Sequence, residues 1–383
     1  MNKDLFKQFE IFFKDFSKII IKVGSSLIVN QDQGNINISW MDALAKDISL
    51  LKSIGKKIII VSSGAIAIGR KSINLKNPTL SIQENQAAAA IGQIELAHAW
   101  QSSLFRENIK CAQILLSPDD TETRRKHLNA RATLATLLDN DIVPVINEND
   151  TVATSEIKFG DNDRLAARVA QMSSSDLLVL LSDIDGLYDS DPKLNKKANH
   201  IPIVEKISIE ITKMAGSKNY EYASGGMHTK LEAAKIANVS GCKMIICDGK
   251  EYNPLKSLTE GSKFTQFNSS YSPLSARKSW IAASLKVSGN LVLDNGAINA
   301  LLKGSSLLPA GVMKVKGNFQ RGDLIDLIND SGEIIASGLS AYDSKEAKLI
   351  AGEKTSSIKN ILGYIGREEL IHRDDLVIRD ING

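Results

Sequence analysis

Residues 141–150 change from apolar to polar halfway along, in the sequence Asp141-Ile142-Val143-Pro144-Val145-Ile146-Asn147-Glu148-Asn149-Asp150. The apolar half, rich in β-branched residues, predicts a buried strand. A second polar cluster, Gly160-Asp161-Asn162-Asp163, follows after a short loop. Ligands of open α/β sheets bind outside the carboxyl ends of the strands, where both clusters are expected. Asn and Asp also form turns, but two clusters around one loop favour a site for a small polar ligand, a metal ion or both.

Other predicted strands end in the same way. Lys18–Val23 is followed by Gly24-Ser25-Ser26, and Lys57–Val61 is followed by Ser62-Ser63-Gly64. Small residues at such turns let a phosphate approach backbone N–H groups. Strands that alternate with helices predict an α/β fold, a mainly parallel sheet between layers of helices. Further strands are predicted at 111–116, 176–181 and 243–247, and helices at 40–55, 82–103, 123–138, 164–172 and 231–238.

Composition excludes several classes of protein. With 383 residues, the chain is long enough for two or three domains. Its net charge of +3 gives no argument for nucleic acid or a membrane surface. The sequence also lacks the run of about 20 apolar residues that a membrane span needs. Its 3 cysteines lack C-x-x-C spacing, which argues against disulfides and a zinc site. We therefore expect a cytoplasmic protein.

The chain divides into parts of different character. Residues 1–16 form an N-terminal extension whose phenylalanines fall at helical spacing, so we expect them to pack against the body or a neighbouring subunit. Residues 17–260 form the α/β domain. Residues 261–281 lack periodicity and are predicted to be a linker. Residues 282–383 form a small, mostly β domain, with a hairpin across Asn329-Asp330-Ser331-Gly332.

Two lysines stand where phosphate chemistry could use them. The chain contains neither G-x-x-x-x-G-K-[ST] nor G-x-G-x-x-G, so the common nucleotide-binding signatures are absent. Lys22 nevertheless lies near a predicted strand end, and Lys230 lies at a predicted helix start, each beside glycine and hydroxyl residues. Fixed cations at such places can meet developing phosphoryl charge. The ordinary alternative for either lysine alone is a solvated surface charge.

Five motifs follow one another along the chain: Ile21-Lys22-Val23-Gly24-Ser25-Ser26, Val61-Ser62-Ser63-Gly64-Ala65-Ile66, Asn147-Glu148-Asn149-Asp150, Gly160-Asp161-Asn162-Asp163 and Gly225-Gly226-Met227-His228-Thr229-Lys230. In this order they resemble the amino-acid kinase family, and within it the members that act on glutamate. Residues 304–309 (GSSLLP) and 317–323 (GNFQRGD) resemble a PUA domain. Two places depart from the family pattern, and both are expected to flank the nucleotide. His228 stands where the family often has a smaller hydroxyl residue, and residues 182–185 differ in detail from the usual pattern.

The resemblance implies a reaction and a set of site residues. The reaction is transfer of the γ-phosphoryl group of ATP, with Mg²⁺, to the side-chain carboxylate of L-glutamate, the first step towards proline. Lys22 and Lys230 are implied to hold the transferring group, Asp163 to orient them, and Asp161 to hold Mg²⁺ directly or through water. The implied glutamate residues are Ser63, Asn147, Asp150 and Asn162, with Asp150 facing the α-ammonium group. The implied nucleotide residues are Lys22, Gly24, Ser182, Asp183, Ser224, Gly225, Gly226, Met227, His228, Thr229 and Lys230.

Two alternatives stay open at this point. One is another kinase of the same fold, acting on N-acetylglutamate, aspartate, carbamate or a nucleotide. The other is an RNA-binding protein that acts through the PUA domain, although the carboxyl-terminal part shows no dense basic stripe. The resemblance also implies feedback inhibition by proline, through the glutamate site and the loop 151–160. It further implies a homo-oligomer, a dimer or a tetramer.

Overall fold

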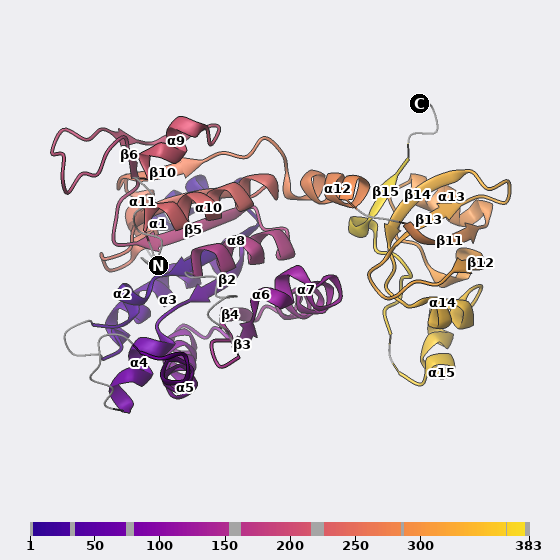
Figure 1. Cartoon of the computed structure of the whole chain (residues 1–383), viewed down its shortest axis with the longest axis horizontal. Helices are drawn as coiled ribbons and strands as arrows, with labels where there is room; N and C mark the ends of the chain where they lie inside the picture. The colour runs from indigo at the N-terminus through magenta and orange to yellow at the C-terminus, as the bar shows by residue number, and fades with distance from the viewer. Residues whose placement is uncertain are drawn as a thin grey trace. The chain divides into compact units, whose positions relative to one another are not determined.

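The computed structural model describes residues 3–30, 35–73, 80–152, 162–215, 226–284, 287–364 and 366–379. The chain forms two compact units, Met1–Pro273 and Leu274–Gly383. The first is an α/β layered unit and the second is built on a small sheet, as Figure 1 shows. Each is described by itself.

An eight-stranded sheet forms the centre of the first unit. The strand β1 lies inside it between β2 and β5, and six neighbouring strands, from β3 to β9, run parallel. The predicted parallel α/β sheet is therefore confirmed. In spatial order the strands are β3 (Cys111–Leu116), β4 (Val143–Glu148), β2 (Lys57–Ser62), β1 (Lys18–Val23), β5 (Leu177–Ser182), β9 (Lys243–Asp248), β10 (Phe264–Phe267) and β8 (Ile203–Val204). Two short strands, β6 (Leu187–Tyr188) and β7 (His200–Ile201), form a separate hairpin.

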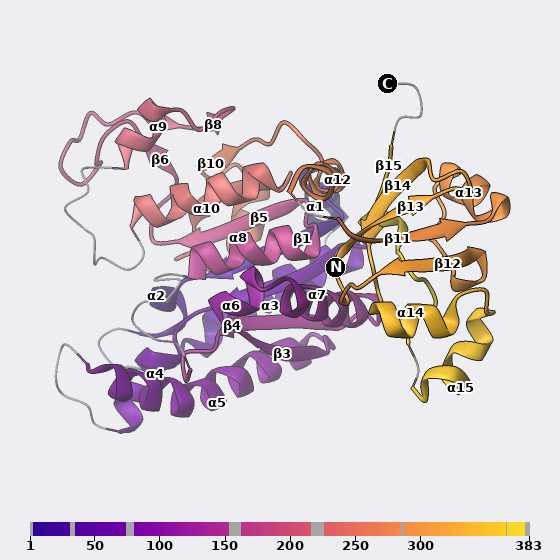
Figure 2. The ribbon, with the colours of Figure 1, turned by 45° about the vertical axis from the view of Figure 1, so that its right-hand side comes forward.

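Helices cover both faces because alternate side chains of the strands point to opposite sides. In β1, Ile19 and Ile21 pack into one core, whereas Ile20 packs into the other. Figure 2 shows α8 and α10 lying over one face of this sheet. The helices on the Ile20 face are α7 (Arg124–Asp139), α8 (Asn162–Ser173) and α10 (Met227–Val239). Those on the other face are α1 (Lys3–Phe13), α3 (Ile38–Ser53), α4 (Ala65–Ser72), α5 (Ile82–Arg106) and α11 (Pro254–Thr259).

Helices α4 and α5 cross at very short range. A Cβ added to Gly69 would lie 1.8 Å from the carbonyl oxygen of Ala88, and one added to Gly92 would lie 1.9 Å from that of Ala65. Neither site accepts a side chain, because backbone atoms cannot move aside as a flexible side chain can. The crossing therefore fixes α5 against the turn that joins β2 to α4.

The phenylalanines of the N-terminal extension belong to the first unit. Phe9 and Phe13 of α1 are fully buried in the same core as Ile19 and Ile21. The ring of Phe12 lies edge-on to that of Phe264, with 5.8 Å between centroids. Phe264 begins β10, which lies inside the segment 261–281 that was predicted as a linker. Four residues in a Ser- and Gly-rich setting are too few to give a strand pattern, so the strand is visible only through its pairing with β9.

The second unit has a five-stranded sheet with its own core. Antiparallel strands β13 and β14 form the hairpin predicted across residues 329–332, which is confirmed. The guanidinium of Arg277 and the carboxylate of Asp375 form a buried ion pair, with Nε 2.8 Å from Oδ1. In spatial order the strands are β12 (Val312–Gly317), β11 (Val287–Leu293), β13 (Leu324–Ile328), β14 (Ile334–Leu339) and β15 (Leu376–Ile378). The helices are α12 (Pro273–Ser284), α13 (Asn295–Leu302), α14 (Ser344–Ile350) and α15 (Ile358–Leu362).

No helix in the described part of the chain combines the length and the apolar character that crossing a membrane requires.

Removal of the Phe13 ring tests whether α1 is part of the core. We expect Phe13→Ala to lower the free energy of unfolding by about 3–5 kcal/mol, because it leaves a cavity in a fully buried site. The matched control is Ile11→Ala on the same helix, where the side chain is 60% exposed and little should change. Urea denaturation measures both. Equal, small effects of the two changes would contradict the packing of α1.

Candidate active site

The carboxyl ends of four neighbouring parallel strands bring the predicted polar residues to one edge of the sheet. In the order β4, β2, β1, β5, these ends are Asn147-Glu148, Ser62, Val23 and Ser182. The strand β1 has β2 on one side and β5 on the other, with Lys22 in register with Val61 and with Leu180. A ligand site at this edge follows the general rule for open α/β sheets.

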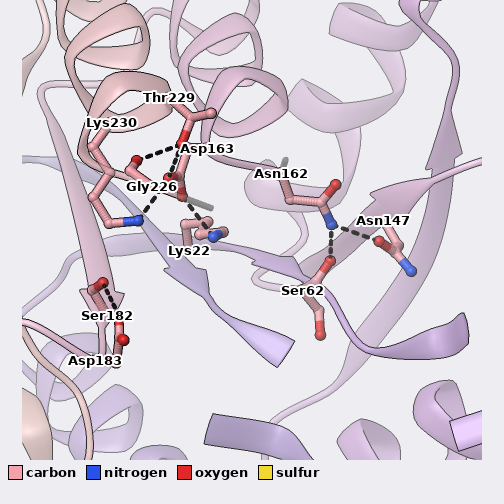
Figure 3. Close-up of polar contacts among 10 residues, drawn as sticks. All are labelled: Lys22, Ser62, Asn147, Asn162, Asp163, Ser182, Asp183, Gly226, Thr229 and Lys230. Carbon is pink, nitrogen blue, oxygen red and sulfur yellow. Dashed lines mark hydrogen bonds and ion pairs between the residues drawn. The ribbon is translucent and has the colours of Figure 1, made fainter. Parts of the chain in front are cut away.

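Three buried charged residues form an ion network at this edge (Figure 3). The Nζ atom of Lys22 lies 2.6 Å from Oδ1 of Asp163, and Nζ of Lys230 lies 3.0 Å from Oδ2. The exposed fractions are 4% for Lys22, 3% for Lys230 and 0% for Asp163. Charges this deeply buried need partners, and here each ammonium group has its own oxygen of one carboxylate.

The sequence places these three side chains on one face. Lys22 lies two residues after Ile20, so it continues the row that points towards α8 and α10. Asp163 is in the first turn of α8, where the helix dipole favours a carboxylate. Lys230 comes from the start of α10, whose N-cap is Gly226. The Thr229 hydroxyl donates to the Gly226 carbonyl oxygen at 2.8 Å and lies 3.4 Å from Oδ2 of Asp163.

The lysines control the ionisation of Asp163. Burial alone raises the pKa of this carboxyl group, but the ammonium groups of Lys22 and Lys230 outweigh burial and hold the pKa well below its ordinary value. Asp163 therefore stays ionised at neutral pH. Two ammonium groups and one carboxylate leave the network with an excess of positive charge.

A second network of amides lies on the β2 and β4 side of Lys22. The Nδ2 atom of Asn162 donates to the Ser62 carbonyl oxygen at 2.5 Å and to Oδ1 of Asn147 at 2.8 Å. Asn147 donates in turn to Oε1 of Gln93 at 2.6 Å. Both asparagines are nearly buried. Asn162 directly precedes Asp163, so the start of α8 contributes to both networks.

No local pattern in the sequence indicates Gln93 or the Ser62 carbonyl group as part of the site. Gln93 is one polar residue within the helix α5, and nothing in its neighbours distinguishes it from the other polar residues there. The Ser62 side chain points to the other side, where its Oγ accepts from Nε1 of Trp100 at 2.8 Å. The Gln93 contact depends on the packing of α5 and the Ser62 carbonyl contact depends on that of α8, and local patterns specify neither.

The turn after β2 has a conformation that needs glycine. Gly64 is the N-cap of α4 and has a φ of 112°, a region that residues with a side chain rarely adopt. It follows Ser63, which is half-buried. The backbone N–H groups at the start of a helix favour anions. Gly24 similarly precedes the short helix α2 (Ser25–Ile28), with an ordinary φ of −71°.

The remaining predicted residues differ in burial, and some of them lie outside the described residues. Ser182 is buried at the end of β5 and its Oγ lies 3.2 Å from Oδ1 of Asp183, which is exposed. Met227 is half-buried and His228 is exposed at the start of α10. Asp150 is half-buried, two residues beyond β4. Asp161, Ser224, Gly225 and most of the loop 151–160 lie outside the described residues.

Comparison with known proteins identifies the fold family. The model of the amino acid kinase family matches residues 17–248, and that of the PUA domain matches residues 289–362. The chain belongs to the amino acid kinase family. It is 52% identical to a glutamate 5-kinase of Paramagnetospirillum magneticum. The alignment spans 361 residues, which are 94% of this chain and 97% of that protein. A glutamate 5-kinase of Agrobacterium fabrum is also 52% identical, over 94% of this chain and 92% of its own length.

Among solved structures, a UMP kinase from Bacillus anthracis matches 67% of this chain and 97% of its own chain, with 15% sequence identity and a TM-score of 0.47.

Neutralising Asp163 tests the ion network. We expect Asp163→Asn to lower the free energy of unfolding at pH 7 by about 3–5 kcal/mol, because two buried ammonium groups lose their carboxylate. Because folding lowers the pKa of Asp163, its charge contributes fully to the free energy of unfolding above the ordinary carboxyl pKa. This contribution is lost as the pH falls through the folded-state pKa. The difference between wild type and variant should therefore shrink below about pH 4.

Urea denaturation across this pH range provides the measurement. Asp139→Asn is the control, since Asp139 forms an exposed pair with Lys57 and should contribute little. A constant difference between wild type and Asp163→Asn from pH 7 to pH 3 would show that Asp163 is not the titrating group.

Proposed function

We propose that this protein transfers the γ-phosphoryl group of ATP to the side-chain carboxylate of L-glutamate, forming L-glutamyl 5-phosphate, the first step of proline biosynthesis. The observation that carries the proposal is the pair of buried lysines held by one carboxylate at the edge of the parallel sheet. Relatives named glutamate 5-kinase, 52% identical over nearly the whole chain, support the choice of acceptor.

The acceptor is already a nucleophile at neutral pH. A glutamate side chain has an ordinary pKa of about 4.3, so it needs no general base. The difficulty of the reaction is electrostatic, because an anionic carboxylate must approach an anionic phosphate. Catalysis then consists of positioning the reactants and compensating their charge. The excess positive charge of the lysine network suits this task.

Lys22 and Lys230 hold the transferring phosphoryl group in this proposal. An ammonium group has three N–H donors, so each lysine can bond Asp163 and phosphoryl oxygens together. Asp163 acts by positioning the two ammonium groups before the substrates bind, so no reorganisation is needed during the reaction. Backbone N–H groups near Gly24 and Gly64 add further donors.

The nucleotide occupies the β5 side of Lys22. Ser182 ends β5 and Asp183 follows it, while the residues from the N-cap Gly226 to Lys230 begin α10. We propose that these two segments flank the nucleotide together with Lys22 and Gly24. Ser224 and Gly225 are proposed on the same grounds of family resemblance. The exposed His228 then lies at the rim of the nucleotide site.

Magnesium accompanies ATP in phosphoryl transfer, where it compensates the charge of the phosphates. Both oxygens of Asp163 already bond lysines, so this carboxylate is not an open metal ligand. Within the described ranges no group of three His, Cys, Asp or Glu side chains could hold a metal ion. We propose that the nucleotide phosphates carry the ion and that Asp161 holds it directly or through water.

Glutamate occupies the β2 and β4 side. Ser63, Asn147, Asp150 and Asn162 surround it in this proposal, with the carboxylate of Asp150 facing the α-ammonium group. L-Proline also has an α-carboxylate and a cationic amine, so we propose that it inhibits by occupying the same place.

Turnover of a panel of acceptors tests the reaction and the role of the lysines. We expect ATP consumption with L-glutamate but not with aspartate, N-acetylglutamate, carbamate or UMP. Lys22→Ala and Lys230→Ala should each lower kcat by on the order of 10²–10³, because each removes a preorganised contact to the transition state. Lys57→Ala, at the other end of β2 and exposed, is the control. Near wild-type turnover in either site variant would reject its catalytic role.

Asp150→Ala tests the acceptor side separately. We expect a steep rise in the KM for glutamate and in the proline concentration that gives half-inhibition, because both ligands lose the partner of their amine. The KM for ATP should change little. Asp139→Ala, on the exposed surface of α7, is the control. Equal changes in the KM of glutamate and of ATP would rule out this assignment.

A further inference from the structure

The side chain of Gln93 completes a row of hydrogen-bonded side-chain amides, and backbone groups fix the orientation of the two asparagines in it. Asn147 Oδ1 accepts from the backbone N–H of Glu148 at 2.9 Å, and a backbone N–H can only donate. Asn162 Nδ2 donates to the backbone carbonyl of Ser62, which can only accept. Neither asparagine can therefore exchange its oxygen and nitrogen without losing a backbone hydrogen bond.

These contacts determine which atom of the Asn162 side chain can face a ligand. Its Nδ2 has two hydrogens, and both are used, by Ser62 and by Asn147. The remaining group is Oδ1, which points away from both partners in Figure 3. Since Oδ1 only accepts hydrogen bonds, it suits a cationic donor and not a carboxylate.

Gln93 lies at the other end of this row of hydrogen-bonded amides and supports the orientation of Asn162 through Asn147. Both lone pairs of Asn147 Oδ1 are used by Glu148 and Asn162, while its Nδ2 donates to Oε1 of Gln93. Without an acceptor at position 93, a buried N–H of Asn147 loses its partner, so the end of this side chain is no longer held in place. A displacement of the Asn147 amide would weaken the hydrogen bond that its Oδ1 accepts from Asn162.

The position of Gln93 is set by the tight crossing of α4 and α5. Its neighbour Gly92 meets the backbone of Ala65 directly, where even a Cβ would lie 1.9 Å from the carbonyl oxygen. This close packing sets the position of α5 over the turn between β2 and α4, where the Gln93 side chain meets Asn147. This rigidity is what a positioning role needs.

We infer that Gln93 is a positioning residue which, through Asn147, holds Asn162 with its Oδ1 facing the α-ammonium group of the acceptor. The inference rests on the proposed function, since it assumes L-glutamate as the acceptor. It goes beyond that function by assigning Gln93 to selectivity for the amine, although Gln93 itself does not touch the substrate. The ammonium then lies between Asp150 and Asn162, one charged and one neutral acceptor.

Kinetics of variants at position 93 test the inference. Gln93→Leu and Gln93→Met both remove the strong acceptor, so either one serves if the other fails to fold, as judged by thermal melting. Gln93→Glu keeps an acceptor for Asn147 Nδ2. The control is Gln101→Leu, the same change at an exposed place on α5. The measurements are the KM of L-glutamate, the KM of ATP and the Ki of glutarate, which is glutamate without its amine.

We expect Gln93→Leu to raise the KM of L-glutamate by on the order of tenfold while the Ki of glutarate and the KM of ATP stay unchanged. Gln93→Glu should restore most of the loss, and Gln101→Leu should behave as wild type. An equal rise for glutamate and glutarate, or an unchanged KM of glutamate, would overturn the inference, as would a Gln93→Glu variant as poor as Gln93→Leu. Wild-type protein without glutamate-dependent turnover would instead overturn the proposed function, and the inference with it.

Discussion

The carboxylate of Asp163 holds two buried ammonium groups apart and in place. Lys22 comes from the central strand and Lys230 from α10, more than two hundred residues later in the chain. Their separate bonds to Oδ1 and Oδ2, at 2.6 and 3.0 Å, tie β1, α8 and α10 together. Burying three charges is costly unless each is paired. Well-packed apolar side chains in the same place would often give equal or greater stability, so the arrangement points to function.

The edge of the sheet has a different chemistry on each side of β1. Towards β2 and β4 lie amides with fixed hydrogen bonds, which suit a small zwitterion. Towards β5 and α10 lie hydroxyl groups and a glycine N-cap, which suit phosphates. Lys22 stands at the boundary between the two sides. A phosphoryl group that moves from one side to the other passes the lysines on its way.

Much of this site was predictable because its parts are local. The apolar runs that end in Gly, Ser and Asn predicted the strands and the edge where they meet, and the family resemblance assigned Lys22, Lys230 and Asp163. Gln93 was missed because its role depends on the crossing of α4 and α5 through Gly69 and Gly92, which involves two helices. The strand β10 was missed because four residues between serines and glycines carry too short a pattern, and its pairing with β9 is long-range.

The most direct test of the central claim is to trap the product. Wild-type protein is incubated with ATP and L-glutamate in the presence of hydroxylamine, which converts an acyl phosphate to a stable hydroxamate. We expect glutamyl hydroxamate to form in step with ADP, because the proposed reaction transfers the phosphoryl group of ATP to a carboxylate. Release of ADP that does not depend on glutamate, or that proceeds without hydroxamate, would contradict phosphoryl transfer to the glutamate side chain.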